Sequence, residues 1–117
     1  MTRRHPLALA ALAGIAALAT LAACAADVPR ATPLDAERAA RARPGTTLAD
    51  LERGRSTYLS KCTSCHRPVA PRSIAGEAWP QHVDEMRERA HLSAEEHDAI
   101  VLYLTTIATA PPPPRSK

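Results

Sequence analysis

The sequence predicts an all-α domain over residues 48–108, and three observations support this fold class. Apolar residues recur at helical spacing in three segments, and no pair of segments shows the strict alternation of β-strands. Each segment opens with residues that commonly start helices. The proline run that begins at Pro111 prevents the last helix from continuing.

The first helix is expected over residues 47–62. Thr47 is placed to cap its N-terminus, and Asp50 lies in its first turn. Tyr58 belongs to the apolar face. Gly54 in the helix interior costs about 1 kcal/mol relative to alanine, so its presence predicts that another helix approaches closely at this point.

The second helix is expected over residues 77–91, with Pro80 at the first helical position. Trp79, Val83 and Met86 fall on one face of this helix, and most of the opposite side is charged. A helix with this pattern packs its apolar face against the rest of the domain.

The third helix is expected over residues 92–108. Ser93 and Glu96 form the sequence pattern of a capping box. Tyr103 and Ile107 belong to its apolar stripe, which should pack across the first helix.

Residues 1–23 have the pattern of a secretory signal peptide, with Arg3 and Arg4 followed by an apolar run. The run ends in "LAAC", which resembles the lipobox of bacterial lipoproteins. That resemblance implies cleavage before Cys24 and lipidation of Cys24, with acyl chains that anchor the protein to a membrane. An uncleaved transmembrane helix and a plain signal peptide are the alternatives. Residue 25 is alanine and not aspartate, which by resemblance to bacterial lipoprotein sorting signals implies the outer membrane if the cell has one.

Removal of residues 1–23 leaves 13 Lys and Arg against 12 Asp and Glu, so the formal charge falls from +3 to +1. The basic character therefore gives no argument for binding nucleic acid. Residues 24–47 are predicted to be a lipidated cysteine and a flexible tether, with a short helical patch over residues 34–42. The proline-rich tail, residues 109–117, is predicted to be disordered.

The segment Cys62-Thr63-Ser64-Cys65-His66 carries the chemistry of the domain. Cysteines three residues apart on a helical turn point the same way, which suits two thioether bonds to one porphyrin edge. A histidine one residue later can then reach over the ring as an axial ligand. A large apolar cofactor would also complete the core of a domain that contains Trp79, Tyr58, Tyr103 and no phenylalanine.

Three other interpretations of the two cysteines are weaker. A zinc site needs four ligands, and the remaining histidines do not follow at a recognisable spacing. A thioredoxin-like redox pair sits at a βα junction, and no strand is predicted here. A structural disulfide between Cys62 and Cys65 would close too small a loop to stabilise the domain well.

The chain resembles the small monohaem c-type cytochromes. "GRSTYLSKCTSCH" resembles the N-terminal helix of that family, and "AIVLYL" resembles the C-terminal helix that crosses it. The resemblance covers about residues 50–107. It implies one covalent haem c attached to Cys62 and Cys65, with His66 as the proximal ligand.

Met86 is the predicted distal iron ligand, because the family often uses a methionine and Met86 is the only methionine after the signal. His82 is the second candidate, and His91 and His97 are expected to be surface residues. A five-coordinate iron is the remaining alternative. In the more familiar family pattern the methionine lies in an extended loop, whereas Met86 is expected on a helix.

Two more residues have expected roles at the cofactor. Trp79 is predicted to pack against the haem edge. Pro71, or else Pro68, is predicted to present its carbonyl to the far nitrogen of His66 and so fix the ring, a role in which the family favours a proline.

The predicted function is single-electron transfer between redox protein partners, by a monomer lipid-anchored at the periplasmic face of a membrane. The protein is expected to be a carrier rather than an enzyme, acting alone or as the cytochrome subunit of an oxidoreductase complex. A haem-based sensor or binder of small ligands is the main alternative. A peroxidase-like enzyme and a structural lipoprotein without haem rank below it.

Overall fold

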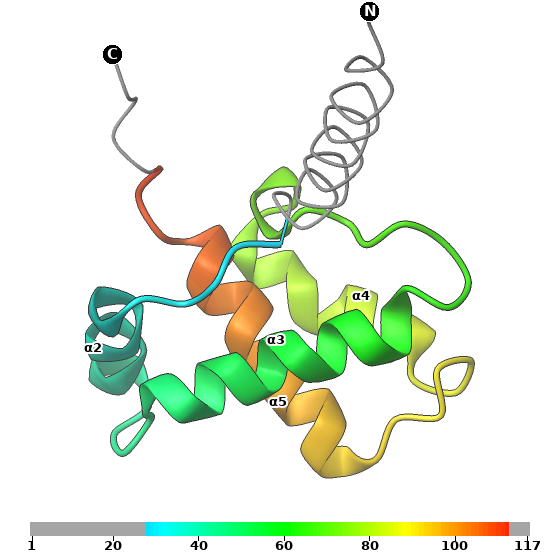
Figure 1. Ribbon diagram of the computed structural model, residues 1–117, viewed down its shortest axis with the longest axis horizontal. Coiled ribbons are helices and arrows are strands. Elements are labelled where there is room, and N and C mark those ends of the chain that lie inside the picture. The colour runs from blue at the N-terminus through cyan, green and yellow to red at the C-terminus, as the bar shows by residue number, and fades with distance from the viewer. Residues whose placement is uncertain (1–27, 113–117) are drawn as a thin grey trace, which may run out of the picture.

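The C-terminal helix α5 (Ala94–Ala108) is the centre of the fold. The computed structural model of the chain describes residues 28–112, and within this range the elements are helices without any strand. Helix α5 packs against α3 (Leu48–Cys62) and α4 (Trp79–Met86), and against α2 (Pro33–Ala42) at one end (Figure 1). Two short 3-10 turns, η1 (Pro71–Ser73) and η2 (Gly76–Ala78), also contact α5. The predicted all-α class is confirmed for the described residues.

Capping boxes begin α2, α3 and α5. Thr32, Thr47 and Ser93 are the N-caps, and each side chain accepts a hydrogen bond from the backbone N–H three residues later. The acidic side chain at that third position accepts in return from the N-cap backbone, so two otherwise unpaired N–H groups are satisfied. The predicted caps Thr47 and Ser93 are confirmed.

Gly54 lies where α3 crosses α5. A Cβ atom at this position would stand 2.1 Å from the carbonyl oxygen of Ala99 and 2.7 Å from Cβ of Tyr103. Only glycine lets the two helix backbones approach this closely, which confirms the close approach predicted from the sequence. The crossing orients the C-terminal half of α3, and therefore Tyr58 and Cys62, relative to α5.

Helix α4 is shorter than predicted, since it ends at Met86 and not at His91. The chain turns over residues 87–91, where His91 has a φ of +51° and the N–H of Leu92 donates to the carbonyl of Arg87 at 3.0 Å. Residues 84–89 are exposed, so no burial favours a longer helix, whereas Leu92 is buried. The turn is what brings Leu92 into the core.

The prediction of a flexible tether over residues 24–47 needs correction for its described part. From Val28 onward the chain packs on the domain, and Val28 is 0% exposed within the core cluster. Helix α2 follows, which confirms the short helical patch predicted over residues 34–42; it is capped at Thr32, and Asp35 and Ala39 are buried. The domain therefore begins at about Val28, twenty residues before the predicted boundary.

Residues 28–32, called the strap from here on, bind to both long helices. The first two carbonyls of the strap accept hydrogen bonds from Nε of Arg55 (3.0 Å) and from the hydroxyl of Tyr103 (2.5 Å). The N–H of Ala31 donates to the carboxylate of Glu52 at 2.8 Å. The strap thus joins α3 to α5 beside their crossing.

The predictions for residues 1–23 and for Cys24 lie outside the described residues, as do residues 113–117 of the predicted tail. The described part of that tail begins with Thr109, and Ala110 is buried. Among the described residues, no helix has the length and apolar character needed to cross a membrane.

Candidate functional site

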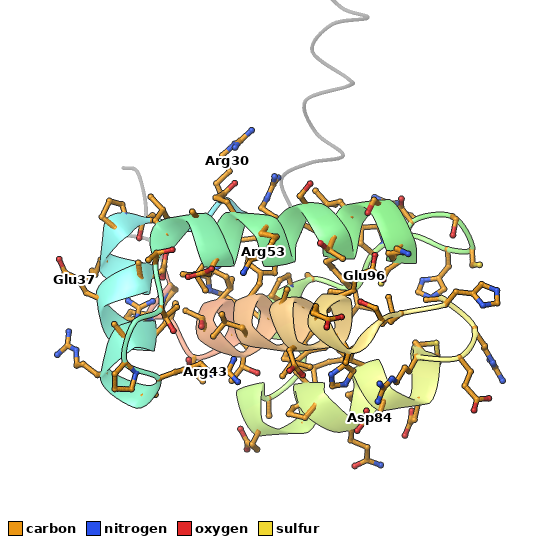
Figure 2. The ribbon with its side chains drawn as sticks, turned by 90° about the horizontal axis from the view of Figure 1, so that it is seen from below. Arg30, Glu37, Arg43, Arg53, Asp84 and Glu96 are labelled. Atoms are coloured by element: carbon orange, nitrogen blue, oxygen red, sulfur yellow. The ribbon has the colours of Figure 1, made fainter. Side chains whose placement is uncertain are left out.

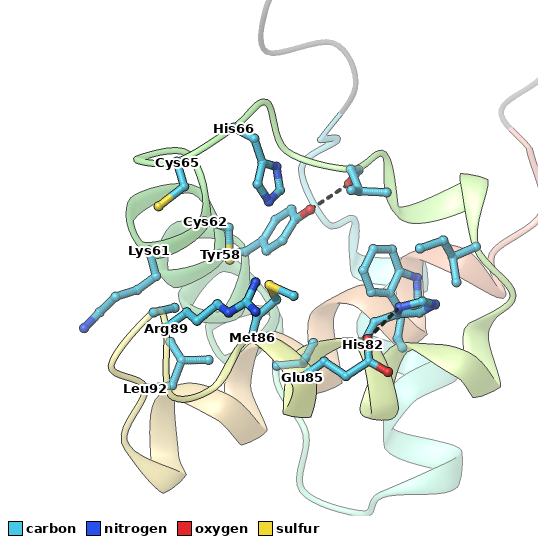
Figure 3. A pocket seen from close by; sticks show the side chains of 15 residues that line it. Tyr58, Lys61, Cys62, Cys65, His66, His82, Glu85, Met86, Arg89 and Leu92 are labelled. Atoms are coloured by element: carbon cyan, nitrogen blue, oxygen red, sulfur yellow. Dashed lines mark hydrogen bonds and ion pairs between the residues drawn. The ribbon is translucent and has the colours of Figure 1, made fainter.

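A cavity of about 270 Å³ lies between the C-terminal end of α3, the loop that follows it, and α4 with its closing turn. Side chains from 15 residues line it, most of them apolar (Figure 3). Five predicted site residues are among them: Cys62, Cys65, His66, Trp79 and Met86. Segments up to 24 residues apart in the sequence therefore present the predicted cofactor-binding groups to one space.

The two cysteines are free thiols at one edge of the cavity. Cys62 is the last residue of α3 and is half-buried, whereas Cys65 is exposed on the turn that follows. Thr63 keeps a helical backbone conformation at the C-cap, so the chain does not straighten between the cysteines. Burial raises the pKa of the Cys62 thiol, and the nearby Cys65 raises it further by a smaller amount.

His66 is exposed, and its ring points toward Tyr58 in the cavity (Figure 3). Its Nδ1 lies 2.7 Å from the carbonyl oxygen of Arg67. When Nδ1 carries the proton it donates to that oxygen, and Nε2 keeps the lone pair that an iron ligand needs. A backbone acceptor therefore orients this histidine.

The structure corrects the role predicted for Pro71. Its carbonyl accepts a hydrogen bond from Nε1 of Trp79 at 2.9 Å, and the carbonyl that pairs with His66 belongs to Arg67. The indole N–H is the physical reason, because Trp79 is buried and its donor needs a partner. Neither Pro71 nor Pro68 lines the cavity.

The four candidate distal ligands separate into two groups. Met86 and His82 line the cavity, and His91 and His97 do not. Met86 is the last residue of α4 and is 37% exposed. Since α4 ends there, Met86 stands at the boundary between helix and turn, which brings it closer to the loop position of the family pattern than the sequence indicated.

His82 and His97 both have acidic neighbours. Nδ1 of His82 lies 3.9 Å from the Glu85 carboxylate. His97 sits between two carboxylates, with Nε2 at 2.9 Å from Asp84 and Nδ1 at 3.1 Å from Asp98. These contacts place His97 on the α4–α5 contact and outside the cavity.

An aromatic wall closes the inner side of the cavity. The ring of Trp79 meets Tyr58 edge-on at a centroid distance of 6.4 Å, and it meets His82 edge-on at 6.1 Å. The hydroxyl of Tyr58 donates to the carbonyl of Val69 at 2.8 Å, which ties the loop after the cysteines to α3. Burial raises the pKa of Tyr58 to about 12, so the phenol stays neutral at physiological pH.

Two cations at the cavity were missed by the sequence interpretation. Lys61 lines the cavity and pairs with Glu96 at 3.1 Å. Arg89 also lines it, and within residues 28–112 it forms no ion pair. The spacing of Arg89, three residues after Met86, was the sequence signal that could have indicated it.

Comparison with protein-family models, with curated proteins and with solved structures gave no match to this chain. Within residues 28–112 no group of three or more His, Cys, Asp or Glu side chains could hold a metal ion. What the site can do therefore follows from the cavity and its lining residues.

Proposed function

We propose that this protein is a membrane-anchored monohaem c-type cytochrome that carries single electrons between redox proteins. One observation supports this more than any other: Cys62, Cys65, His66 and Met86, the groups that would attach and ligate a haem, line one mostly apolar cavity. Sequence spacing alone grouped Cys62, Cys65 and His66, and in the fold Met86 lines the same cavity.

The donor set and the lining fit a covalently held haem. Cys62 and Cys65 would form the thioether bonds, and His66 and Met86 would supply the imidazole and thioether ligands of the iron. Haem, when bound, supplies a one-electron iron couple. An apolar lining suits a large, mostly apolar macrocycle, and Arg89 offers a cation to its carboxylate groups.

The described residues give this site a closed side and an open side. Trp79, Val83 and Leu92 are buried behind the cavity and exclude water there. Cys65, His66 and Met86 are exposed, so the cavity opens to solvent on their side. A carrier needs this combination, because the cofactor must be held in an apolar environment and yet come close to a partner protein.

A second candidate function is a haem-based sensor or binder of small ligands. The observation in its favour is the exposure of Met86 at the very end of an eight-residue helix. A ligand at a helix end is held by fewer neighbours, and a small molecule could displace it.

The location is part of the proposal. Cleavage before Cys24 and its lipidation would anchor the protein at the periplasmic face of a membrane, as a monomer that meets redox protein partners there. The outer membrane is favoured if the cell has one.

Absorption spectroscopy of the oxidised and reduced protein, produced with haem-attachment machinery, tests the function. We expect a low-spin haem c spectrum with a far-red charge-transfer band that Met86→Ala removes and His82→Ala leaves unchanged. A high-spin spectrum that responds to carbon monoxide in the wild type would favour the sensor. A colourless protein would contradict both functions.

A further inference from the structure

We propose that the strap and the outer side of α3 rest on the anionic lipid surface in which Cys24 is anchored. This inference depends on the lipidation proposed above and goes beyond it, because it assigns the face of the domain that meets the membrane. A lipoprotein domain on a long flexible tether has no such face.

The segment between Cys24 and the folded domain is short. Only residues 25–27 separate Cys24 from Val28. Four extended backbone steps span at most about 14 Å. A flexible tether over residues 24–47 would instead have a typical end-to-end distance of about 27 Å and a maximum of about 80 Å. Val28 must therefore lie close to the membrane surface.

The strap cannot simply act as extra tether, because it is fixed to the domain. Val28 is fully buried, and the strap's hydrogen bonds end on Arg55 and Glu52 of α3 and on Tyr103 of α5. The surface beside Val28 is consequently brought to the lipid together with the strap.

The charges on this side suit anionic headgroups. Arg30 of the strap has a side chain that is 78% exposed. It is paired with Glu52 at 3.2 Å, and residues 53–76, which follow along α3 and the next loop, contain no Asp or Glu. Basic side chains near a membrane surface are attracted to anionic lipids.

Glu52 is the acidic residue beside Arg30, whereas Asp84 lies far from it. Figure 2 shows Arg30 projecting from the α3 side, while Asp84 lies on α4 at the opposite side, with α5 between the two helices. The exposed cation of the strap therefore lies on the side that chain length brings to the lipid, where an anionic surface would attract it.

This orientation would hold the cavity at a fixed height. Cys62 follows Arg55, the residue that holds the strap, by seven positions, which is about 10 Å along the helix axis. The cavity would then stay on the order of 25 Å from the lipid anchor.

Energy transfer between the protein and the vesicle surface tests the orientation. The lipidated full chain would be placed in phosphatidylglycerol vesicles that contain a little dansyl-labelled lipid, and quenching of the dansyl by haem would be measured. A variant with about 20 Gly and Ser residues inserted between Asp27 and Val28 should quench less, most clearly in high salt. The same insertion after Ala110 is the matched control and should quench like the wild type.

A second pair of variants tests the charged face. In the inserted background at low salt, R30Q should reduce the remaining quenching, whereas R87Q, the same change at the exposed residue that ends α4, should not. Equal effects of these changes would overturn the assignment of the face. Equal quenching by the inserted and wild-type proteins at both salt concentrations would overturn the proposal as a whole.

Two measurements distinguish failure of the proposed membrane orientation from failure of the proposed function. Mass spectrometry of the N-terminal peptide shows whether Cys24 carries lipid. Without lipid, both the proposed membrane location and the proposed membrane-facing surface are refuted. The absorption spectrum shows whether haem is attached. Without haem, energy transfer from Trp79, the single tryptophan of the chain, to dansyl replaces the quenching measurement.

Discussion

Substitution of Gly54 by alanine should destabilise the domain, although alanine is the better helix former. The added Cβ would stand 2.1 Å from the Ala99 carbonyl oxygen, and neither that backbone nor Cβ of Tyr103 can rotate away. Overpacking of this kind costs up to about 3 kcal/mol, and the gain in helix propensity returns about 1 kcal/mol. The net loss is about 2 kcal/mol, or about 10 °C in Tm for a domain of this size.

Thermal unfolding of the wild type and Gly54→Ala, followed by circular dichroism, measures this loss. Ser56→Ala, an exposed position of the same helix, is the control and should change Tm little. An unchanged or raised Tm for Gly54→Ala would refute the reasoning, because it would mean that α3 and α5 do not cross at Gly54 in solution.

Three further predictions concern the cap of α2, the aromatic wall and pH. Asp35→Ala should lower the free energy of unfolding by about 1–2 kcal/mol, because it breaks a buried capping box, and urea titration should show a smaller loss for Asp50→Ala, the same change in the more exposed capping box of α3. Trp79→Phe removes the hydrogen bond to Pro71 and part of a buried ring, so urea titration should show a loss of about 2 kcal/mol. Burial raises the pKa of Tyr58 in the folded state to about 12, above its unfolded value of about 10, so stability should fall as pH rises from about 10 to 12, and Tyr58→Phe should reduce that fall. An equally steep alkaline loss in Tyr58→Phe would contradict this assignment.

The helices were predictable where local signals and long-range packing agree. Thr47 and Ser93 start α3 and α5 through contacts three residues away, and such contacts can be read from the sequence. Gly54 was informative for the opposite reason, because its residue type conflicts with a helix interior and so indicates a tertiary contact.

The N-terminal strap was not predictable in the same way. Residues 28–32 have no periodicity, and their partners Arg55 and Tyr103 lie 27 and 74 positions away. Helix α2 itself was predicted as a short patch over residues 34–42, and the capping pattern at Thr32 and Asp35 was a further local signal for it. The order of this segment comes from tertiary contacts, which composition does not reveal.

The candidate site was predictable to different extents. Cys62, Cys65 and His66 came from spacing alone, whereas Met86 depended on a resemblance and on its being the only remaining methionine. The partner of His66 was wrongly predicted, because the choice of carbonyl depends on the path of the loop and on the competing demand of the Trp79 indole.

The central position of α5 also affects when the domain can form. Within residues 28–112, α5 is the last helix and contacts every other element, and the strap is held by a tyrosine 74 residues later. The earlier helices have little to pack against until α5 is present, since contacts this distant in sequence form late. During the proposed export the chain would therefore stay unfolded, with Cys62 and Cys65 accessible, until almost all of it has crossed the membrane. Because α5 comes last in this order of elements, the two cysteines would stay accessible for haem attachment until the domain folds.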